Sequence, residues 1–131
     1  MKKFFAILLT LSFLILAVSC GKSQESPKVV YMNINAQQAK EIMDTETGYV
    51  ILDVRTQEEF DSGHVPGAIL IPDYEIKEKA PQVLTDKNQK ILVYCRSGRR
   101  SKLACEELVN LGYTNLYEFG GINDWPYETE F

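Results

Sequence analysis

The residue types best suited to chemistry gather around one cysteine. Cys95 directly follows residues 90–94, a short run rich in Ile and Val that is typical of a buried strand. Residues 101–111 then show apolar side chains at helical spacing, and Gly112 stands where a glycine commonly ends a helix. The apolar positions are Leu103, Ala104, Leu108 and Leu111. The sequence therefore predicts a strand, a short loop and a helix, with a thiol in the loop.

The predicted position of Cys95 favours the thiolate form of its side chain. Backbone N–H groups at the start of a helix are unpaired and the helix dipole adds partial positive charge there, so an anion is stabilised. Nearby cations act in the same direction. These cations are Arg96, Arg99, Arg100 and Lys102. We expect Cys95 to be a nucleophile, provided that it is accessible and that the loop N–H groups point toward it; the alternative is an inert small residue.

The motif CRSGRR at residues 95–100 resembles the active-site loop of rhodanese-like sulfurtransferases. In that family a cysteine opens a six-residue loop whose amides surround the transferred sulfur. The resemblance implies a catalytic role for Cys95 and a substrate-binding role for the residues that follow it. Those residues are Arg96, Ser97, Gly98, Arg99, Arg100 and Ser101. The spacing does not say which arginine turns toward the substrate.

The length of this loop separates the pattern from that of related phosphatases, which use Cys-x5-Arg. Ser101 lies six residues after Cys95, and the nearest arginine is Arg100, one position too early. On that spacing the loop suits a single sulfur atom better than a tetrahedral phosphate. A phosphatase or arsenate reductase is therefore a less favoured alternative.

A second motif, DVRTQEEFDSGHVPGA at residues 53–68, closely resembles the family signature D-V-R-x-x-x-E-F-x-x-G-H-I-P-G-A, with Val65 as the only change. In the family this segment mainly frames the cysteine loop. Asp53 and Arg55 flank one residue at a strand end, so their side chains point to the same side. A partly buried ion pair is favoured for them, and a role in orienting the substrate is the alternative.

His64 is the only histidine in the chain, so a metal site built from several histidines is excluded. We expect His64 to fix a turn by hydrogen bonding. General-base catalysis is the alternative, and sulfur transfer needs no base once the cysteine is ionised. Asp53, Arg55 and His64 are thus predicted to support the site, and no metal or cofactor is expected.

Alternating strand and helix patterns predict the fold. Strands are expected at 29–32, 49–54, 69–71, 90–94 and 114–119. Helices are expected after the capping residues Asn35 and Thr56, at 75–79 with Pro81 preventing continuation, and at 101–111. This order predicts an α/β fold with three layers, α/β/α, and a mainly parallel five-stranded sheet, as the rhodanese resemblance also implies. The motifs should then meet at the carboxyl edge of the sheet.

Residues 120–125, GGINDW, resemble the terminal G-G-x-x-x-W of the same family. The two glycines would permit a tight backbone near the cysteine loop. Trp125 is expected to cover core surface, and a role as a wall of the substrate pocket is the alternative.

The N-terminus carries an export pattern. Residues 2–3 are lysines, and they precede an apolar run at 4–18 that is short for a membrane-spanning helix of ~20 residues. The segment 17–20, AVSC, resembles a bacterial lipobox, although alanine stands where leucine is usual. The resemblance implies that Cys20 is lipidated. An ordinary secreted protein and an uncleaved anchor are the alternatives.

These boundaries predict three parts: a signal peptide at 1–19, a lipid-anchored tether at 20–28 and one rhodanese-like domain at 29–131. The domain would lie outside the cytoplasm, anchored to the cell membrane or to the outer membrane on the periplasmic side. Removing 1–19 would take away two lysines and change the formal charge from −4 to −6. An acidic protein of this kind is not expected to bind nucleic acid.

Cys105 lies on the predicted helix that follows the loop, beside its apolar face. We expect it to be a small core residue. A disulfide between Cys95 and Cys105 would disable the loop, so no structural disulfide is expected.

Together these features predict a thiosulfate sulfurtransferase of the rhodanese type. Cys95 would take sulfur from a small anionic donor as a persulfide and pass it to a thiol, cyanide or a protein acceptor. The main alternative is a module that binds a protein partner or senses oxidants through Cys95 without catalysis.

Overall fold

The computed structural model describes residue 21 and residues 31–131 of the 131-residue chain. The predicted signal peptide and Cys20 lie outside the described residues. Five strands form one sheet: β1 (Met32–Asn33), β2 (Val50–Asp53), β3 (Ile69–Leu70), β4 (Ile91–Cys95) and β5 (Leu116–Gly121). Their order is β1-β5-β4-β2-β3, and every neighbouring pair is parallel. The predicted parallel five-stranded sheet is confirmed.

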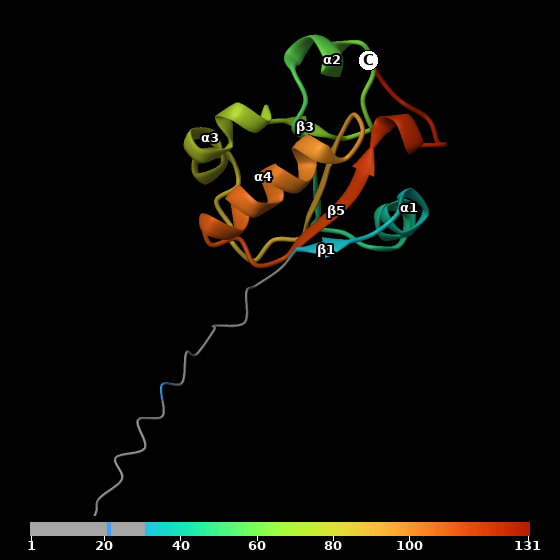
Figure 1. Ribbon diagram of the computed structural model, residues 1–131. Coiled ribbons are helices and arrows are strands. Elements are labelled where there is room, and N and C mark those ends of the chain that lie inside the picture. The colour runs from blue at the N-terminus through green and yellow to red at the C-terminus, as the bar shows by residue number, and fades with distance from the viewer. Residues whose placement is uncertain (1–20, 22–30) are drawn as a thin grey trace, which may run out of the picture.

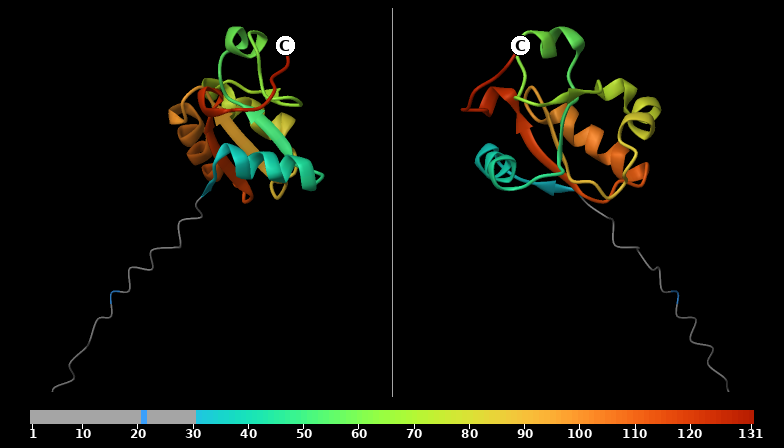
Figure 2. Two further views of the ribbon diagram at one scale, coloured as in Figure 1. Left: turned by 90° about the vertical axis from the view of Figure 1, so that its right-hand side faces the viewer. Right: turned by 180° about the vertical axis from the view of Figure 1, so that it is seen from behind.

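The helices cover both faces of this sheet. They are α1 (Ala36–Thr45), α2 (Gln57–Asp61), α3 (Ile76–Val83) and α4 (Arg99–Asn110), with short 3₁₀ turns η1 (Asp73–Glu75) and η2 (Ile122–Asp124). Helix α1 lies on one face, and α3 and α4 lie together on the other (Figures 1 and 2). The short α2 sits beyond the carboxyl end of the strands, close to the C-terminal segment (Figure 1). Among the described residues, no helix has the length and apolarity needed to cross a bilayer.

Strand β4 is buried on both faces, and its side chains divide between two cores. Ile91, Val93 and Cys95 belong to the cluster under α3 and α4, whereas Leu92 and Tyr94 belong to the cluster that includes Ala39 of α1 and Trp125. This division follows from the two-residue period of a strand. It directs the Cys95 side chain toward the face that α4 covers.

Both predicted capping boxes are present. The Asn35 side chain accepts the Gln38 N–H at 2.8 Å and Gln38 returns a bond to the Asn35 N–H. At the start of α2, the Thr56 hydroxyl accepts the Glu59 N–H and the Glu59 carboxylate accepts the Thr56 N–H. Each cap satisfies backbone donors that a helix start leaves unpaired.

Two local predictions are wrong. Pro81 lies inside α3 rather than beyond its end. The helix continues for only two residues past Pro81, which is on the exposed side, so the loss of one N–H near the helix end is tolerated. Leu103 is 53% exposed, because the buried face of α4 is formed instead by Ser101, Ala104, Cys105 and Leu108.

Candidate active site

Cys95 ends β4, beside Gly121 of the neighbouring β5, at the carboxyl edge of the sheet. The backbone N–H of Gly98 donates to Sγ at 3.0 Å, and Sγ lies 3.3 Å from the Ser101 hydroxyl. Burial raises the pKa of Cys95, but the side-chain hydrogen bond with Ser101 and the backbone amides of Ser101, Gly98 and Ser97 lower it by more, so that the pKa lies below its ordinary value. The loop N–H groups therefore point toward the sulfur, as predicted.

The loop owes its shape to two glycines. Gly98 has a φ of +102° at the N-cap of α4, a left-handed conformation that side chains other than glycine disfavour. Gly121 lies directly against the loop, since a Cβ there would be 2.0 Å from the Arg96 carbonyl oxygen. The same carbonyl accepts the Asn123 N–H at 3.1 Å. The terminal glycine motif thus packs against the cysteine loop, as the sequence predicted.

Cys95 is less accessible than a nucleophile was expected to be. The residue is only 1% exposed, although Arg96 and Ser97 immediately after it are exposed. A donor must bring its own sulfur into contact with Sγ. In this conformation Sγ is not accessible to a donor in solution.

The three arginines of the loop lie in different environments. Arg100 forms a bidentate pair with Glu59 of α2, with both N···O distances at 2.8 Å. That pair is the main reason why the pKa of Glu59 is lowered to about 2. Arg96 and Arg99 are exposed and form no salt bridge within residues 31–131. These two remain available to an anionic donor.

Glu118 is a site residue that the sequence analysis missed. It lies on β5, is 2% exposed, and its Oε1 accepts the Ser101 hydroxyl at 2.6 Å and the Gly120 N–H at 2.9 Å. Its position one residue before Phe119 in a predicted strand could have suggested burial. Only the fold brings it to Ser101, which is 17 residues away in sequence.

Asp53 and Arg55 form the predicted ion pair, and it is more deeply buried than expected. The residues are 0% and 5% exposed, and the Arg55 guanidinium also donates to the Gly63 carbonyl at 2.7 Å. Tyr94 donates its hydroxyl to Asp53 and accepts the Val65 N–H at 3.0 Å. This network ties β2, β4 and the segment after α2 together.

His64 bonds the segment after α2 to the C-terminus. Its Nδ1 lies 3.0 Å from the Phe60 carbonyl, its Nε2 lies 3.2 Å from Glu130 Oε1, and its ring stacks on Phe60. Two backbone hydrogen bonds also join His64 and Glu130 in an antiparallel bridge. These contacts are those of a turn-fixing residue.

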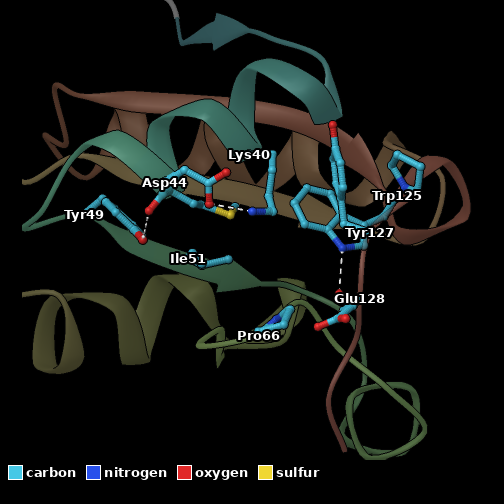
Figure 3. Close-up of a pocket in the computed structure, with 10 residues that line it drawn as sticks. Lys40, Asp44, Tyr49, Ile51, Pro66, Trp125, Tyr127 and Glu128 are labelled. Carbon is cyan, nitrogen blue, oxygen red and sulfur yellow. Dashed lines mark hydrogen bonds and ion pairs between the residues drawn. The ribbon is translucent and has the colours of Figure 1, made fainter.

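Two cavities lie near these elements. A cavity of about 340 Å³ includes Arg96 of the loop together with Arg55 and Glu59 in its wall. A larger one, of about 860 Å³, lies between α1 and the C-terminal segment and includes Lys40, Tyr49, Trp125 and Tyr127 (Figure 3). None of its lining residues comes from the loop at 95–101, so Trp125 packs in the core and does not face the cysteine.

The two cysteines of the described domain are both free thiols, and Cys105 is fully buried as predicted. Within the described part of the chain, no group of three or more His, Cys, Asp or Glu side chains is placed to hold a metal ion.

Comparisons with known proteins agree on one family. The rhodanese-like domain matches residues 35–127. Thiosulfate sulfurtransferase PspE of Escherichia coli (strain K12) is 44% identical over 73 residues, which cover 56% of this chain and 70% of PspE. The putative sulfur carrier protein YrkF of Bacillus subtilis (strain 168) is 33% identical over 98 residues, 74% of this chain and 52% of YrkF. This chain thus spans about half the length of YrkF.

The solved structures lead to the same group. A rhodanese with anions from E. coli has a TM-score of 0.59 and 39% sequence identity, and the match covers 63% of this chain and 96% of the other. A rhodanese-related protein from Thermoplasma volcanium has a TM-score of 0.65 and 33% identity, covering 76% of this chain and 98% of the other.

Proposed function

Because the chain belongs to the rhodanese-like domain family, we propose that it is a sulfurtransferase that carries sulfane sulfur on Cys95. The observation that carries this proposal is the set of donors aimed at one sulfur: the Gly98 N–H at 3.0 Å and the hydrogen bonds from Ser97 and Ser101 that lower the pKa of Cys95. The names of PspE, a thiosulfate sulfurtransferase, and of YrkF, a putative sulfur carrier, support the same chemistry.

In the first step the Cys95 thiolate attacks the outer sulfur of a thiosulfate-like donor. A new S–S bond forms at Sγ, the S–S bond of the donor breaks, and sulfite leaves with the electron pair. The product is a persulfide whose terminal sulfur carries the negative charge that the loop amides stabilise. Arg96 and Arg99, both exposed, attract the anionic donor.

In the second step a thiol, cyanide or a partner protein takes the terminal sulfur and releases the Cys95 thiolate. The two half-reactions share one site, so ping-pong kinetics are expected. A protein acceptor would approach the exposed side of the loop, where Arg96 and Ser97 lie.

The burial of Cys95 supports a second candidate function, a module that binds a protein partner. Cys95 is 1% exposed, and protein binding by a rhodanese fold without turnover does not need an accessible thiol. The two functions differ in whether Cys95 accepts sulfur from a small donor. A binding module would leave Cys95 unmodified by small sulfur donors.

The intact mass of the protein after incubation with thiosulfate tests the proposal. A sulfurtransferase gains the mass of one sulfur atom and loses it again when a thiol is added. Cys105→Ala is the matched control and must gain the same mass, whereas Cys95→Ala must gain nothing. No mass gain in the parent protein would leave the binding module as the better description.

We further propose that the protein is exported and anchored through a lipid on Cys20. The support is the sequence alone: the short apolar run at 4–18 and the lipobox-like segment at 17–20. Metabolic labelling with a radioactive fatty acid should mark the full-length protein and fail to mark Cys20→Ala. Label retained in that variant would contradict the anchor.

A further inference from the structure

Glu118 is a buried carboxylate that the sulfur-transfer scheme leaves unused. It is 2% exposed, and no Lys or Arg within residues 31–131 forms a salt bridge with it. Its contacts are the Ser101 hydroxyl at 2.6 Å and the Gly120 N–H at 2.9 Å, both on Oε1. A buried charge without a cation is costly, so the two hydrogen bonds carry the burden of stabilising this carboxylate.

Ser101 joins this carboxylate to the reactive sulfur. Its Oγ lies 3.3 Å from Cys95 Sγ and 2.6 Å from Glu118 Oε1. A hydroxyl has one proton to donate and two lone pairs to accept with. Glu118 Oε1 is nearer to this hydroxyl than the other two acceptors, the carbonyls of Gly98 at 3.0 Å and Gly120 at 3.3 Å, and it is the only charged one. The proton is therefore directed to the carboxylate, which leaves a lone pair for the S–H of a protonated Cys95.

Ionisation of Cys95 reverses the direction of both bonds. A thiolate can only accept, so a Ser101 hydroxyl that stays bonded to Sγ does so as the donor. Its oxygen can keep a hydrogen bond to Glu118 only if the carboxyl group now carries a proton. The geometry therefore links loss of a proton at Cys95 to gain of a proton at Glu118.

We propose that Glu118 accepts the proton of the Cys95 thiol through the Ser101 hydroxyl. The S–H proton passes to Ser101 Oγ, and the Oγ–H proton passes to Glu118 Oε1. One negative charge moves from the carboxylate to the sulfur and none is created, so the thiolate forms in a buried loop without a second buried charge. This inference rests on the proposed sulfur transfer, for which it supplies the ionised nucleophile.

The other titratable groups near the pair do not compete for this proton. The pKa of Cys105 on α4 is raised chiefly by burial and next by the charge of Glu118. The pKa of Tyr31, which precedes β1, is also raised chiefly by burial, with a smaller contribution from Glu118. Both groups therefore stay neutral near pH 7. Arg100 is already paired with Glu59, and this pair, more than the charge on Cys95, raises the pKa of Arg100. Cys95 and Glu118 are left to share one proton.

A shared proton has a measurable signature. Two strongly coupled groups titrate in two steps that belong to the pair, and between the steps the fraction of thiolate does not change with pH. The rate of Cys95 alkylation by iodoacetamide, followed by intact mass, should thus show two steps with a plateau between them. In Glu118→Gln a single step should remain, with a rate that changes roughly tenfold per pH unit below its midpoint. Glu106→Gln, on the exposed side of α4, is the matched control and should keep the plateau.

A second pair of variants tests the link itself. Ser101→Ala keeps the carboxylate and removes the bridge, so its profile should show one step, displaced to higher pH, and Ser101→Thr should restore the plateau. These variants decide the matter if Glu118→Gln does not fold, as judged by circular dichroism. An unchanged two-step profile in either Glu118→Gln or Ser101→Ala would overturn the proposal.

The same measurements separate this inference from the function on which it rests. Alkylation reports Cys95 directly and needs no sulfur donor. If the plateau disappears as expected but thiosulfate adds no mass to the parent protein, the proton relay stands and sulfur transfer falls. If mass is gained but the profile is a single step in the parent protein, sulfur transfer stands and the relay falls.

Discussion

Cys95 and Cys105 are buried in the same hydrophobic cluster, with exposed fractions of 1% and 0%, yet their pKa values move in opposite directions. The pKa of Cys105 is raised chiefly by burial. Cys95 experiences burial too, but it also accepts hydrogen bonds from Ser101, Gly98 and Ser97. Burial therefore does not decide which thiol is reactive. The number of donors aimed at the sulfur decides it.

The loop amides and the loop arginines also differ in how strongly they affect the pKa of Cys95. Hydrogen bonds from the loop are the leading causes that lower the pKa of Cys95. Arg100 faces Glu59 instead and forms a bidentate pair with it, which offsets its charge. Arg96 and Arg99 extend into solvent, where their fields are screened. We infer that the arginines serve the approach of the donor more than the ionisation of the sulfur.

The largest effect is expected from Cys95→Ser. The hydroxyl keeps the size and the hydrogen bonds of the thiol but is not ionised near pH 7, so thiosulfate:cyanide sulfur transfer should fall by at least ~1,000-fold. Circular dichroism and thermal melting should match the parent protein. Activity that persists in this variant would refute Cys95 as the sulfur carrier.

A smaller effect is expected from Gly121→Ala, which changes the donors around Cys95 without touching the thiol. The added methyl group would lie 2.0 Å from the Arg96 carbonyl oxygen, so the loop must shift. A shift of about 1 Å in a reacting group can cost ~100-fold, and we expect Cys95 alkylation and sulfur transfer to fall ~10- to 100-fold.

The control for this variant is Gly112→Ala, at the end of α4. Its φ of +96° makes alanine unfavourable by about 1–2 kcal/mol, but no atom lies within 4 Å of the added methyl group. Stability should therefore fall while the reactivity of Cys95 stays within about twofold of the parent. Equal losses of reactivity in both variants would show that stability, and not loop position, sets the reactivity of Cys95.

Glu59→Gln tests the clamp between α2 and the loop helix. It removes the charge opposite Arg100 and should lower the free energy of unfolding by roughly 1–3 kcal/mol at pH 7, with only a few-fold change in Cys95 alkylation. Because the pKa of Glu59 is lowered in the folded state from 4.5 to about 2, its stabilisation is complete above pH 4.5 and is lost as pH falls toward 2. Urea unfolding at several pH values should show that the difference in free energy of unfolding between the variant and the parent protein shrinks over that range. If this difference stays constant with pH, the ion pair between Glu59 and Arg100 does not stabilise the protein as proposed.

The fold was readable from the sequence because its signals are local. The apolar run 90–94, the capping pair Thr56 and Glu59, and the motif at residues 53–68 each determine a short element. Parallel order and the meeting of the motifs at one sheet edge follow from the alternation of strands and helices. The errors at Pro81 and Leu103 are also local: a proline near a helix end costs little, and helical spacing alone does not say which of two adjacent faces is buried.

The site was readable only in part, because its decisive contacts join distant segments. The loop and its cysteine could be found from CRSGRR, but the pairing of Arg100 with Glu59 spans 41 residues and that of Ser101 with Glu118 spans 17. Glutamate in a predicted strand gives no sign of its partner. The 1% exposure of Cys95 depends on how the whole loop packs against Gly121, which no local pattern encodes.

The smallest effect is expected from Cys105→Ala, and it is the sharpest test of the contrast between the two thiols. The raised pKa keeps Cys105 neutral, so its removal takes no charge from the neighbourhood of Cys95. Loss of one buried sulfur should lower the free energy of unfolding by about 1 kcal/mol, while the pH profile of Cys95 alkylation should stay where it is. Urea unfolding and alkylation of the same preparation measure both quantities. A displaced profile would mean that Cys105 is ionised in the native state, and the pair would then have to be treated as coupled thiols rather than as one reactive and one structural residue.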